Sequence, residues 1–368
     1  MTEFKTKNYI KEIKSNFINS QVFSFLNKKQ FLNVIIYNKE LQQIFGVNIK
    51  DYKKISGKYR ICKKGKGKEY TLENKLIFEG EYLNRKRNGK GKEYLSNGNL
   101  EFEGEYLNGE RNGKGKEYYC EGKLEFEGEY LNGERNGKGM VYYYNGELEF
   151  EGEYLNGKIW NGKGYNRQGK IEFEIKEGKG YVKEYNKYGE LRFEGEYLNG
   201  ERNGKGKEYF YDDELEFEGE YLNGERNGKG KVYYLSGGIM FEGEYLNGRK
   251  NGKGKEYLSN GNLEFEGEYL NGERNGKGKE YYYNGKVLFE GEYLEGKIWN
   301  GKGYHIEGYN VFEIKEGKGK VIIYYPDGDL EYYGEYLDGE KWNGKLFTSD
   351  YRDIIIEEEY KDGINISK

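Results

Sequence analysis

The phrase FEGEYL occurs nine times in this chain of 368 residues. The copies begin at Phe78, Phe102, Phe126, Phe150, Phe193, Phe217, Phe241, Phe265 and Phe289, so their spacing is constant except for one longer step. A fixed period of roughly 20 to 50 residues is the mark of a repeat array, whose units stack on their neighbours instead of folding alone. The period therefore predicts an array of small, identical units.

Each unit begins with a segment, LEFEGEY, in which two kinds of residue alternate strictly. Phe126, Gly128 and Tyr130 point to one face, and Glu127 and Glu129 point to the other. This period of two is the pattern of a β-strand.

The rest of the unit predicts a turn, a second strand and a further turn. LNGERN turns the chain, and GKGKEYY alternates again, with Lys114 and Lys116 on one face. A following turn such as Asn145-Gly146 supplies the positive φ that tight hairpins need. Each unit is therefore expected to be one β-hairpin, with a row of glutamates beside a row of lysines on one face. On the other face, glycines lie beside rings and leave them room.

Degenerate copies extend the array on both sides. One fits at Ile55, and two fit after the last full copy, at Tyr332 and Ile356; shorter variants open FEIKEGKG at Phe173 and Phe312. GKIWNGKGY occurs at 157-165 and again at 296-304, so the array looks like a duplicated block of about six units. We expect a helical module at 1-54, about thirteen units at 55-363, and a tail at 364-368.

Charge and composition restrict the kinds of partner that the chain can bind. Lys+Arg 61 against Asp+Glu 65 leaves a net charge of -4, so no basic excess is present to hold nucleic acid. No apolar run reaches the roughly 18 residues of a membrane span, and no signal peptide is recognisable. Cys62 and Cys120 have no metal-like spacing. We expect a soluble, cytoplasmic protein that binds no metal.

Residues that could carry catalysis are few. His305 is the only histidine and has no Ser, Cys or carboxylate at motif spacing, so we expect an exposed turn residue. Glu127 and Glu129 recur in every unit, whereas a catalytic pair would occur once. GKGK lacks the layout of a phosphate-binding loop. The sequence thus predicts no enzyme and no cofactor.

The unit EFEGEYLNGERNGKGKEYY resembles the MORN repeat, which has the pattern YxGxxxxGxxxGxG. The resemblance covers roughly residues 55-363. It implies a mainly β fold, an elongated single-layer antiparallel array of β-hairpins with a groove. It also implies proteins that scaffold, dimerise or contact membranes and do not catalyse, so a homodimer is one expected form.

Two sets of residues in the array are candidates for binding a protein partner. Phe and Tyr rings of the ring-and-glycine face are expected to line the groove, represented by Phe102, Tyr106, Phe126, Tyr130, Phe217, Tyr221, Phe265 and Tyr269. Trp160 and Trp299, like Trp342, break the repeat pattern at equivalent points and mark either a bend or a ligand contact.

The N-terminal segment, 1-54, is different in character. Apolar residues recur at three- and four-residue steps, the amphipathic helix pattern, and ten lysines against four acids give a charge of +6, which leaves -10 for the repeats. INSQVFSFLNKKQFLNVIIYNKELQQIF resembles an F-box. The resemblance implies that Phe23, Phe25, Leu26 and Leu32 contact a Skp-type ubiquitin-ligase adaptor. The alternative is a helical cap on the open edge of the array.

These features favour a non-enzymatic protein-protein interaction scaffold, with a substrate-recruiting role in a ubiquitin ligase if the F-box resemblance holds. The alternative is a peripheral protein that binds anionic lipid; because glutamates alternate with the lysines, such contact is expected to be weak and confined to residues 1-54. A carbohydrate-binding aromatic-repeat module is a third interpretation, which the few tryptophans disfavour.

Overall fold

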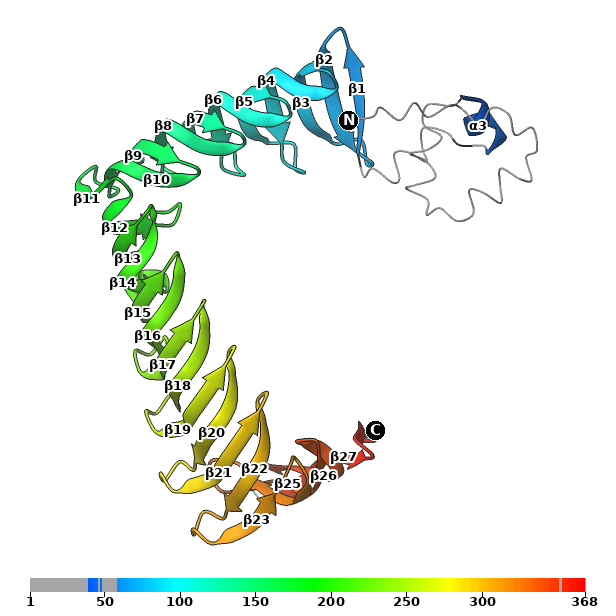
Figure 1. Cartoon of the computed structure of the whole chain (residues 1–368), viewed down its shortest axis with the longest axis vertical. Coiled ribbons are helices and arrows are strands. Elements are labelled where there is room, and N and C mark those ends of the chain that lie inside the picture. The colour runs from blue at the N-terminus through cyan, green and yellow to red at the C-terminus, as the bar shows by residue number, and fades with distance from the viewer. Residues whose placement is uncertain (1–38, 46, 48–57, 351–352, 368) are drawn as a thin grey trace, which may run out of the picture. The chain divides into compact units, whose positions relative to one another are not determined.

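The computed structural model describes residues 39–45, 47, 58–350 and 353–367, which fall into two compact units, Met1–Arg135 and Asn136–Lys368. The described part is mainly β and consists of antiparallel β-hairpins that follow one another in chain order (Figure 1). This confirms the predicted fold class. Of the expected N-terminal helical module, the structure describes one short helix, α3 (Lys39–Ile44).

The first unit contains seven complete strands. They are β1 (Lys58–Lys63), β2 (Lys66–Thr71), β3 (Leu76–Leu83), β4 (Lys86–Tyr94), β5 (Leu100–Leu107), β6 (Glu110–Tyr118) and β7 (Leu124–Leu131). The next strand, β8 (Glu134–Tyr142), crosses the boundary between the units.

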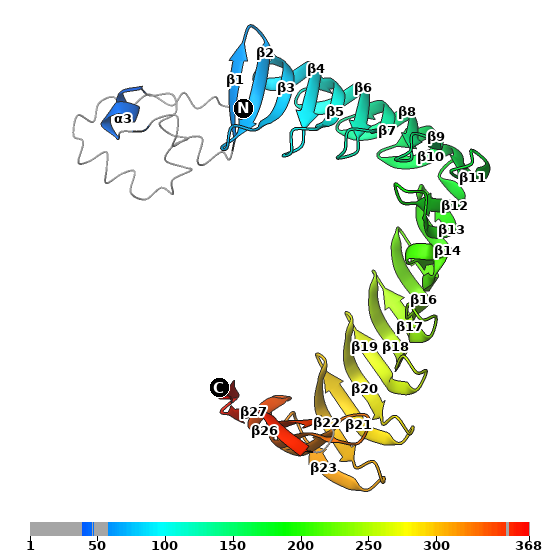
Figure 2. The ribbon, with the colours of Figure 1, turned by 180° about the vertical axis from the view of Figure 1, so that it is seen from behind.

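The second unit continues with the same hairpins and one 3-10 helix, η2 (Tyr211–Asp213). Opposite views in Figures 1 and 2 show β13 to β22 succeeding one another in order. The strands are β9 (Leu148–Leu155), β10 (Lys158–Tyr165), β11 (Ile171–Lys176), β12 (Lys179–Tyr185), β13 (Leu191–Leu198), β14 (Glu201–Tyr209), β15 (Leu215–Leu222), β16 (Glu225–Tyr233), β17 (Ile239–Leu246), β18 (Arg249–Tyr257), β19 (Leu263–Leu270), β20 (Glu273–Tyr281), β21 (Val287–Leu294), β22 (Lys297–Tyr304), β23 (Asn310–Ile314), β24 (Gly319–Tyr324), β25 (Leu330–Leu337), β26 (Glu340–Asp350), β27 (Asp353–Lys361) and β28 (Ile364–Asn365).

Strand pairing repeats from hairpin to hairpin. Gly243 of β17 lies opposite Gly254 of β18, and Glu242 lies opposite Lys255. Between β23 and β24 the ladder is reduced to a single bridge, and the last five strands form a sheet of their own. Because each strand pairs with its neighbours in the sequence, the array is built from local contacts.

Two kinds of turn recur between the strands. Asn108 and Gly109 both have positive φ, 55° and 104°, as a two-residue hairpin turn requires. At Asn145-Gly146 only the glycine has positive φ, 89°, while the Asn145 Oδ1 accepts a hydrogen bond from the N–H of Glu147 at 3.0 Å. The expectation that the Asn-Gly pair supplies positive φ therefore holds fully for the first kind of turn and only at glycine for the second.

A regular bulge interrupts the strand pairing near the LNG turns, and a second register shift recurs at the other end of the strands. Gly243 pairs with Gly254, but Tyr245 pairs with Lys250, so β18 carries two extra residues at this point. Gly252 lies in this bulge at φ +95°, where a Cβ would stand 2.0 Å from the Glu244 Oε2. The bulge thus needs a glycine both for its backbone conformation and for space.

Candidate functional site

The ring-and-glycine face, called the ring face below, is the core of the array. The eight rings predicted as partner contacts are all buried, with exposed fractions of 0–5%. Phe102 covers two glycines, because a Cβ on Gly104 or Gly115 would lie 2.6 or 2.5 Å from its Cζ atom. The Phe102 and Tyr130 rings meet edge to face at 5.2 Å between centroids. The rings therefore serve packing first, and their partner-binding role stays a prediction.

Arginines close the ring face from the solvent side. The Arg111 guanidinium lies over the Phe102 ring, 4.1 Å from its centroid, a cation–π arrangement. The same side chain forms ion pairs with Glu93 of the preceding hairpin at 2.5 Å and with Glu117 at 3.0 Å. Phe102 is thus held between backbone glycines and a guanidinium, whereas Phe241 has the Lys250 ammonium 4.3 Å from its ring centroid instead.

These ion pairs join successive hairpins into a series that we call the Arg–Glu ladder. It consists of Glu69, Arg87, Glu93, Arg111, Glu117 and Arg135 in the first unit, and of Glu184, Arg202, Glu208 and Arg226, then Lys250, Glu256, Arg274 and Glu280, in the second. Val232 takes the glutamate position between Arg226 and Lys250, opposite Phe217 and Phe241. The ladder was not evident from the sequence, in which the arginines fall within the predicted LNGERN turns.

Two glutamates of the ladder differ in how many cations they meet. Burial alone would raise the pKa of Glu256, but a hydrogen bond from Lys250 and the charge of Arg274 outweigh it and lower that pKa. Burial raises the pKa of Glu280, and Arg274 and Tyr293 oppose this only in part. Ile298 follows at the next arginine position, opposite Tyr293, so Glu280 ends the ladder with one arginine.

The two candidate tryptophans pack on turn glycines. The carbonyl of Trp160 accepts the N–H of Gly178 at 2.8 Å, and a Cβ on that glycine would lie 2.7 Å from the Trp160 Cζ3. Trp299 makes the same 2.8 Å hydrogen bond with Gly317, in the second copy of the duplicated block. The duplication seen in the sequence is thus present in the structure. Both tryptophans are half-buried packing residues, and a ligand contact stays a prediction.

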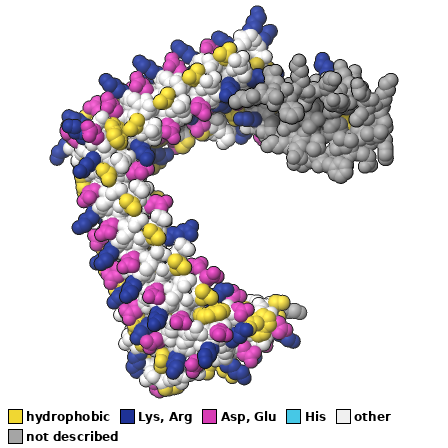
Figure 3. Space-filling view, in the orientation of Figure 1, with side chains coloured by type: hydrophobic (Ala, Val, Ile, Leu, Met, Phe, Trp, Pro, Cys, Tyr) yellow, Lys and Arg dark blue, Asp and Glu magenta, His cyan; other side chains and the backbone are white. Residues whose placement is uncertain are grey.

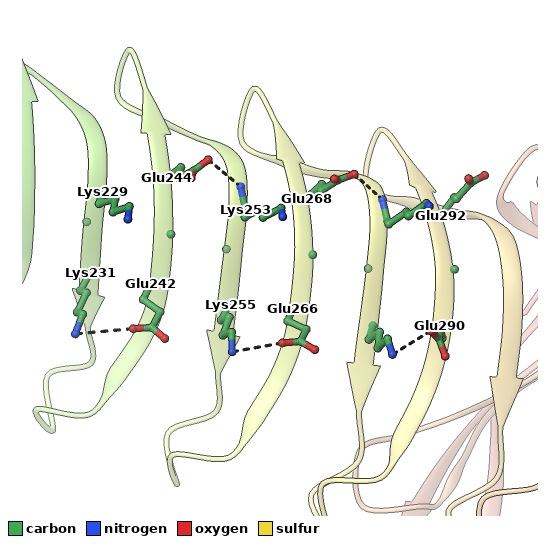
Figure 4. A pocket seen from close by; sticks show the side chains of 18 residues that line it. Lys229, Lys231, Glu242, Glu244, Lys253, Lys255, Glu266, Glu268, Glu290 and Glu292 are labelled. Carbon is green, nitrogen blue, oxygen red and sulfur yellow. Dashed lines mark hydrogen bonds and ion pairs between the residues drawn. The ribbon is translucent and has the colours of Figure 1, made fainter.

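The groove that the structure shows lies on the opposite face of the strands, so the expectation that rings line it is not met. This charged groove, of about 900 Å³, extends over β16 to β21 (Figure 4). It is lined by glycine backbone and two rows of charged side chains, which comprise Lys229, Gly230, Lys231, Glu242, Gly243, Glu244, Lys253, Gly254, Lys255, Glu266, Gly267, Glu268, Lys277, Gly278, Lys279, Glu290, Gly291 and Glu292. Figure 3 shows basic and acidic side chains interspersed on the visible surface.

In the base row of the charged groove, farther from the LNG turns, lysine and glutamate pair across strands. Lys231–Glu242, Lys255–Glu266 and Lys279–Glu290 form ion pairs at 3.8, 3.4 and 3.0 Å between nitrogen and oxygen. Tyrosines border this row: Tyr257 donates its hydroxyl proton to Glu242 at 2.7 Å, and burial together with this carboxylate raises the pKa of Tyr257 to about 12. The Glu row beside a Lys row, predicted from the sequence, is therefore present.

In the tip row, nearer the LNG turns, the glutamates bind backbone. The Glu244 carboxylate accepts the N–H of Lys253 at 3.2 Å, and that of Glu268 accepts the N–H of Lys277 at 2.9 Å (Figure 4). The row contains Lys229, Glu244, Lys253, Glu268, Lys277 and Glu292. The two rows therefore use the same residue types in different ways.

The remaining single candidates occupy ordinary positions. His305 is half-buried, with its ring stacked on Tyr309 at 4.7 Å between centroids, so the expectation of an exposed turn residue is corrected. Cys62 and Cys120 are exposed, and the Cys120 thiol donates a hydrogen bond to the Glu121 carboxylate at 2.8 Å. Within the described ranges, no group of three or more His, Cys, Asp or Glu side chains could hold a metal ion. Phe23, Phe25, Leu26 and Leu32 lie outside the described residues.

Comparison with known families relates the hairpins to one kind of repeat. Seven segments of the chain match the family model of the MORN repeat. The matching segments are residues 78–100, 102–123, 126–147, 193–214, 217–239, 241–263 and 265–287. The MORN repeat family is a non-enzymatic repeat family. Its matches here leave out residues 148–192, which include β10 with Trp160, and residues 288–368, which include β22 with Trp299. No curated protein sequence matches the chain.

Solved structures show only distant likeness. Crystal structures of TcdB2-TccC3-TEV, and of TcdB2-TccC3 without its hypervariable C-terminal region, share 10% and 9% identity over 79% and 81% of this chain, with TM-scores of 0.15 and 0.17. Alternansucrase in complex with isomaltononaose shares 14% over 80%, with a TM-score of 0.16. This chain spans 15–19% of those chains, and the likeness carries no argument. In the part of the chain that the structure describes, no helix has the length and apolar character to cross a membrane.

Proposed function

We propose that the chain is a non-enzymatic scaffold that holds a protein partner on the charged groove. The observation that carries this proposal is the contrast in exposure between the two faces. Phe217, Phe241 and Phe265 are 0–1% exposed, whereas the groove of about 900 Å³ on the other face is open along six strands. A partner can reach the charged side chains without disturbing the core.

A binding role also fits the chemistry of the groove better than catalysis does. Every carboxylate in the groove recurs in equivalent positions of neighbouring hairpins, and the base-row carboxylates are neutralised by lysine partners. Catalytic groups are instead singular and have environments that push their pKa values apart. We therefore expect no turnover from this chain, and a hydrolase activity lost on His305→Gln with the fold intact would contradict this.

Site-specific photo-crosslinking of the full chain in cells tests the proposed surface. A photoreactive residue at Lys253 lies in the charged groove, and one at Ser236, an exposed residue of the loop after β16, serves as the control. We expect protein adducts from position 253 and few from position 236. Equal yields at the two positions, or no protein adduct at 253, would contradict the scaffold function of the groove.

The alternative function is binding of anionic lipid. Glutamates alternate with lysines in both rows of the groove, and each carboxylate reduces the attraction of a nearby lysine to a negative surface. We therefore expect weak, salt-sensitive binding of the full chain to vesicles that contain phosphatidylserine. If strong binding persists when Lys231, Lys255 and Lys279 are changed to Gln, the lipid-binding site lies elsewhere in the chain. If strong binding is lost with these changes, the lipid function of the groove is favoured.

The ubiquitin-ligase role concerns residues 1–54 and rests on the sequence resemblance. We propose it as a refinement of the scaffold, in the cytoplasm, in which a Skp-type adaptor binds Phe23, Phe25, Leu26 and Leu32 and the repeats hold the substrate. Changing Leu26 and Leu32 to Glu in the full chain should abolish capture of purified adaptor with unchanged melting. Aggregation of the variant would instead indicate an edge cap.

A further inference from the structure

The second copy of the duplicated block lacks a polar network that the first copy contains. In the first copy, Lys183 forms ion pairs with Glu172 at 3.1 Å and with Glu194 at 3.9 Å. The Asn166 Nδ2 donates a hydrogen bond to Glu172 at 2.8 Å. The equivalent residues of the second copy are His305, Val311, Ile322 and Tyr333. Because the strands pair in the same register in both copies, these replacements lie close together.

Four of these residues and their neighbours form an exposed patch, called the aromatic patch below. Its principal members are His305, Tyr309, Ile322, Tyr324 and Tyr333. The His305 ring stacks on Tyr309 at 4.7 Å and meets Tyr324 edge to face at 5.2 Å between centroids. Ile322 lies two residues before Tyr324 on β24 and opposite Tyr333 on β25. Tyr309 and Tyr333 are 55% and 57% exposed, so the patch presents ring surface to solvent.

The aromatic patch has a less charged environment than the same place in the first copy. Burial and then the neighbouring Tyr309 raise the pKa of Tyr324. The pKa of the equivalent Tyr185 is raised by burial and by Glu172, while Lys183 opposes the rise. The replacement of the polar network has therefore removed the charges that lie beside this tyrosine.

Charged residues of both signs border the patch. Lys345 of β26 lies opposite Tyr333, and Lys320 of β24 lies opposite Glu335 of β25. This mixed border favours neither an acidic nor a basic partner. The chemistry of a partner is therefore set by the rings and by their hydrogen-bonding groups.

The patch also offers hydrogen-bond donors that lack an acceptor. The Nδ1 of His305 accepts the N–H of Glu307 at 3.3 Å, so the neutral imidazole carries its proton on Nε2. Among the described residues, no group accepts a hydrogen bond from this Nε2–H or from the hydroxyls of Tyr309 and Tyr333. A partner that covers the patch therefore gains most if it combines apolar surface with free acceptors.

These requirements select the backbone form of the partner. An α-helix uses its carbonyls in its own hydrogen bonds, and an added β-strand needs the edge of a sheet, whereas the patch lies on a face. A polyproline II segment has no internal hydrogen bonds, so its carbonyls are free to accept them. Proline adds apolar surface without an N–H donor, and proline-rich segments dock on aromatic-lined surfaces of other proteins.

We propose that the aromatic patch binds a proline-rich segment of a protein partner in the polyproline II form. Prolines pack on the rings of Tyr309 and Tyr333, and carbonyls of the segment accept hydrogen bonds from the His305 Nε2–H and from the tyrosine hydroxyls. This surface is separate from the charged groove over β16 to β21, so the inference goes beyond the function proposed above.

An unbiased peptide selection on the full chain tests this inference. Random peptides displayed on phage are panned against the protein, and the enriched peptides are measured by fluorescence anisotropy and circular dichroism. We expect peptides with prolines at three-residue spacing and a polyproline II spectrum, which decaproline displaces. Ile322→Lys with Tyr333→Glu installs the ion pair that the first copy forms between Lys183 and Glu194, and should weaken these peptides about tenfold.

Two further variants separate the parts of the proposal. Tyr333→Phe keeps the ring and removes one hydroxyl, so it should weaken binding about threefold. This variant also decides the outcome if the double variant of Ile322 and Tyr333 does not fold. Lys255→Gln with Lys279→Gln changes the charged groove and should alter the affinity less than about twofold.

Other results would overturn the inference. Enriched peptides that lack prolines, or that become helical on binding, would contradict the polyproline II form. Proline-rich peptides that bind the double variant of Ile322 and Tyr333 as tightly as the parent would show that the site is not the aromatic patch, and so would the absence of any enriched peptide. Crosslinking at Lys253 tests the charged groove separately, so these failures would leave the scaffold function standing.

Discussion

The two faces of the same strands carry equally regular rows, yet one is closed and the other is open. On the ring face, Phe265 is 0% exposed and lies under Arg274, which forms ion pairs with two glutamates. On the charged face, Leu270 of the same strand is 51% exposed. Both are apolar residues repeated once per hairpin. This difference indicates that a repeated apolar residue is buried only where glycines on the neighbouring strand leave room for its side chain.

The largest expected effect distinguishes two apolar residues of β19, Phe265 on the ring face and Leu270 on the charged face. Phe265→Ala removes a buried ring and should lower the free energy of local unfolding of β19 and β20 by about 3 to 5 kcal/mol. Leu270→Ala removes a half-exposed side chain and should cost less than about 0.5 kcal/mol. Amide hydrogen exchange of these two strands measures both values. Similar costs for the two variants would break the distinction between the faces.

A second prediction concerns the glycines under the rings. Gly254→Val places side-chain atoms where Phe241 Cε2 and Cζ lie 2.6 Å from the Cβ position, and overpacking of this kind should cost about 1 to 3 kcal/mol. The effect should stay within neighbouring hairpins, because contacts are local.

The control for this variant is Gly238→Ala. Gly238 does not adopt a positive φ, and the nearest atom to its Cβ position is 3.9 Å away. The loss of unfolding free energy should therefore be near zero. Hydrogen exchange that speeds up equally along both compact units in the Gly254 variant would contradict the local account.

The sequence permits prediction of the hairpins and of which residues share a face, because the period of two is a direct consequence of strand geometry. It did not reveal the Arg–Glu ladder, since LNGERN was predicted as a turn, whereas β6 begins at Glu110 and brings Arg111 opposite Tyr106 on the ring face. A signal was present. Arg and Glu recur six residues apart, and where Val232 replaces the Glu, the next hairpin has Lys250 instead of Arg.

The charged groove was harder to predict. The sequence shows glutamate and lysine rows, and simple pairing predicts that all lysines are neutralised. Whether a glutamate binds a lysine side chain or a lysine backbone N–H depends on the bulge at Gly252, which opens space for the Glu244 carboxylate. Such a choice is set by local backbone geometry and is not encoded in the spacing of residues.

A third prediction compares two ladder glutamates across pH. At pH 7, Glu256→Gln should cost about 1.5 to 3 kcal/mol, because it weakens the pairing of both Lys250 and Arg274. Glu280→Gln should cost less than about 0.5 kcal/mol or stabilise, because that half-buried carboxylate pairs with one arginine, whereas Glu256 pairs with two cations.

The direction of each pKa shift gives the pH dependence of this pair. The pKa of Glu256 is lowered in the folded state, so its contribution is present above its ordinary pKa, about 4.3, and is lost as pH falls. The pKa of Glu280 is raised, so its contribution is present at low pH and is lost as pH rises through the folded value. Local unfolding measured between about pH 4 and 7 should therefore change in opposite directions for the two variants relative to the parent. Parallel changes would contradict the ladder.

The smallest expected effect lies on the charged face. Lys255→Gln removes an exposed ion pair, whose side chains are 47% and 36% exposed, and should cost less than about 0.5 kcal/mol. Lys253→Gln removes an ammonium without a carboxylate partner and should leave stability unchanged. Thermal unfolding of both variants within about one degree of the parent is the expected result. A large loss for Lys253→Gln would show that this lysine serves the fold and not a partner.

Thiol labelling along β16 tests most directly whether the partner binds the charged face and leaves the ring face closed. Lys229→Cys, Val232→Cys and Lys231→Cys are made singly, with Cys62 and Cys120 replaced by Ser, and labelling rates are compared with and without the partner obtained by crosslinking. The account predicts that the partner slows labelling at 229 and 231, while position 232 labels slowly in both states. Protection by the partner at position 232 alone, or at none of the three positions, would contradict it.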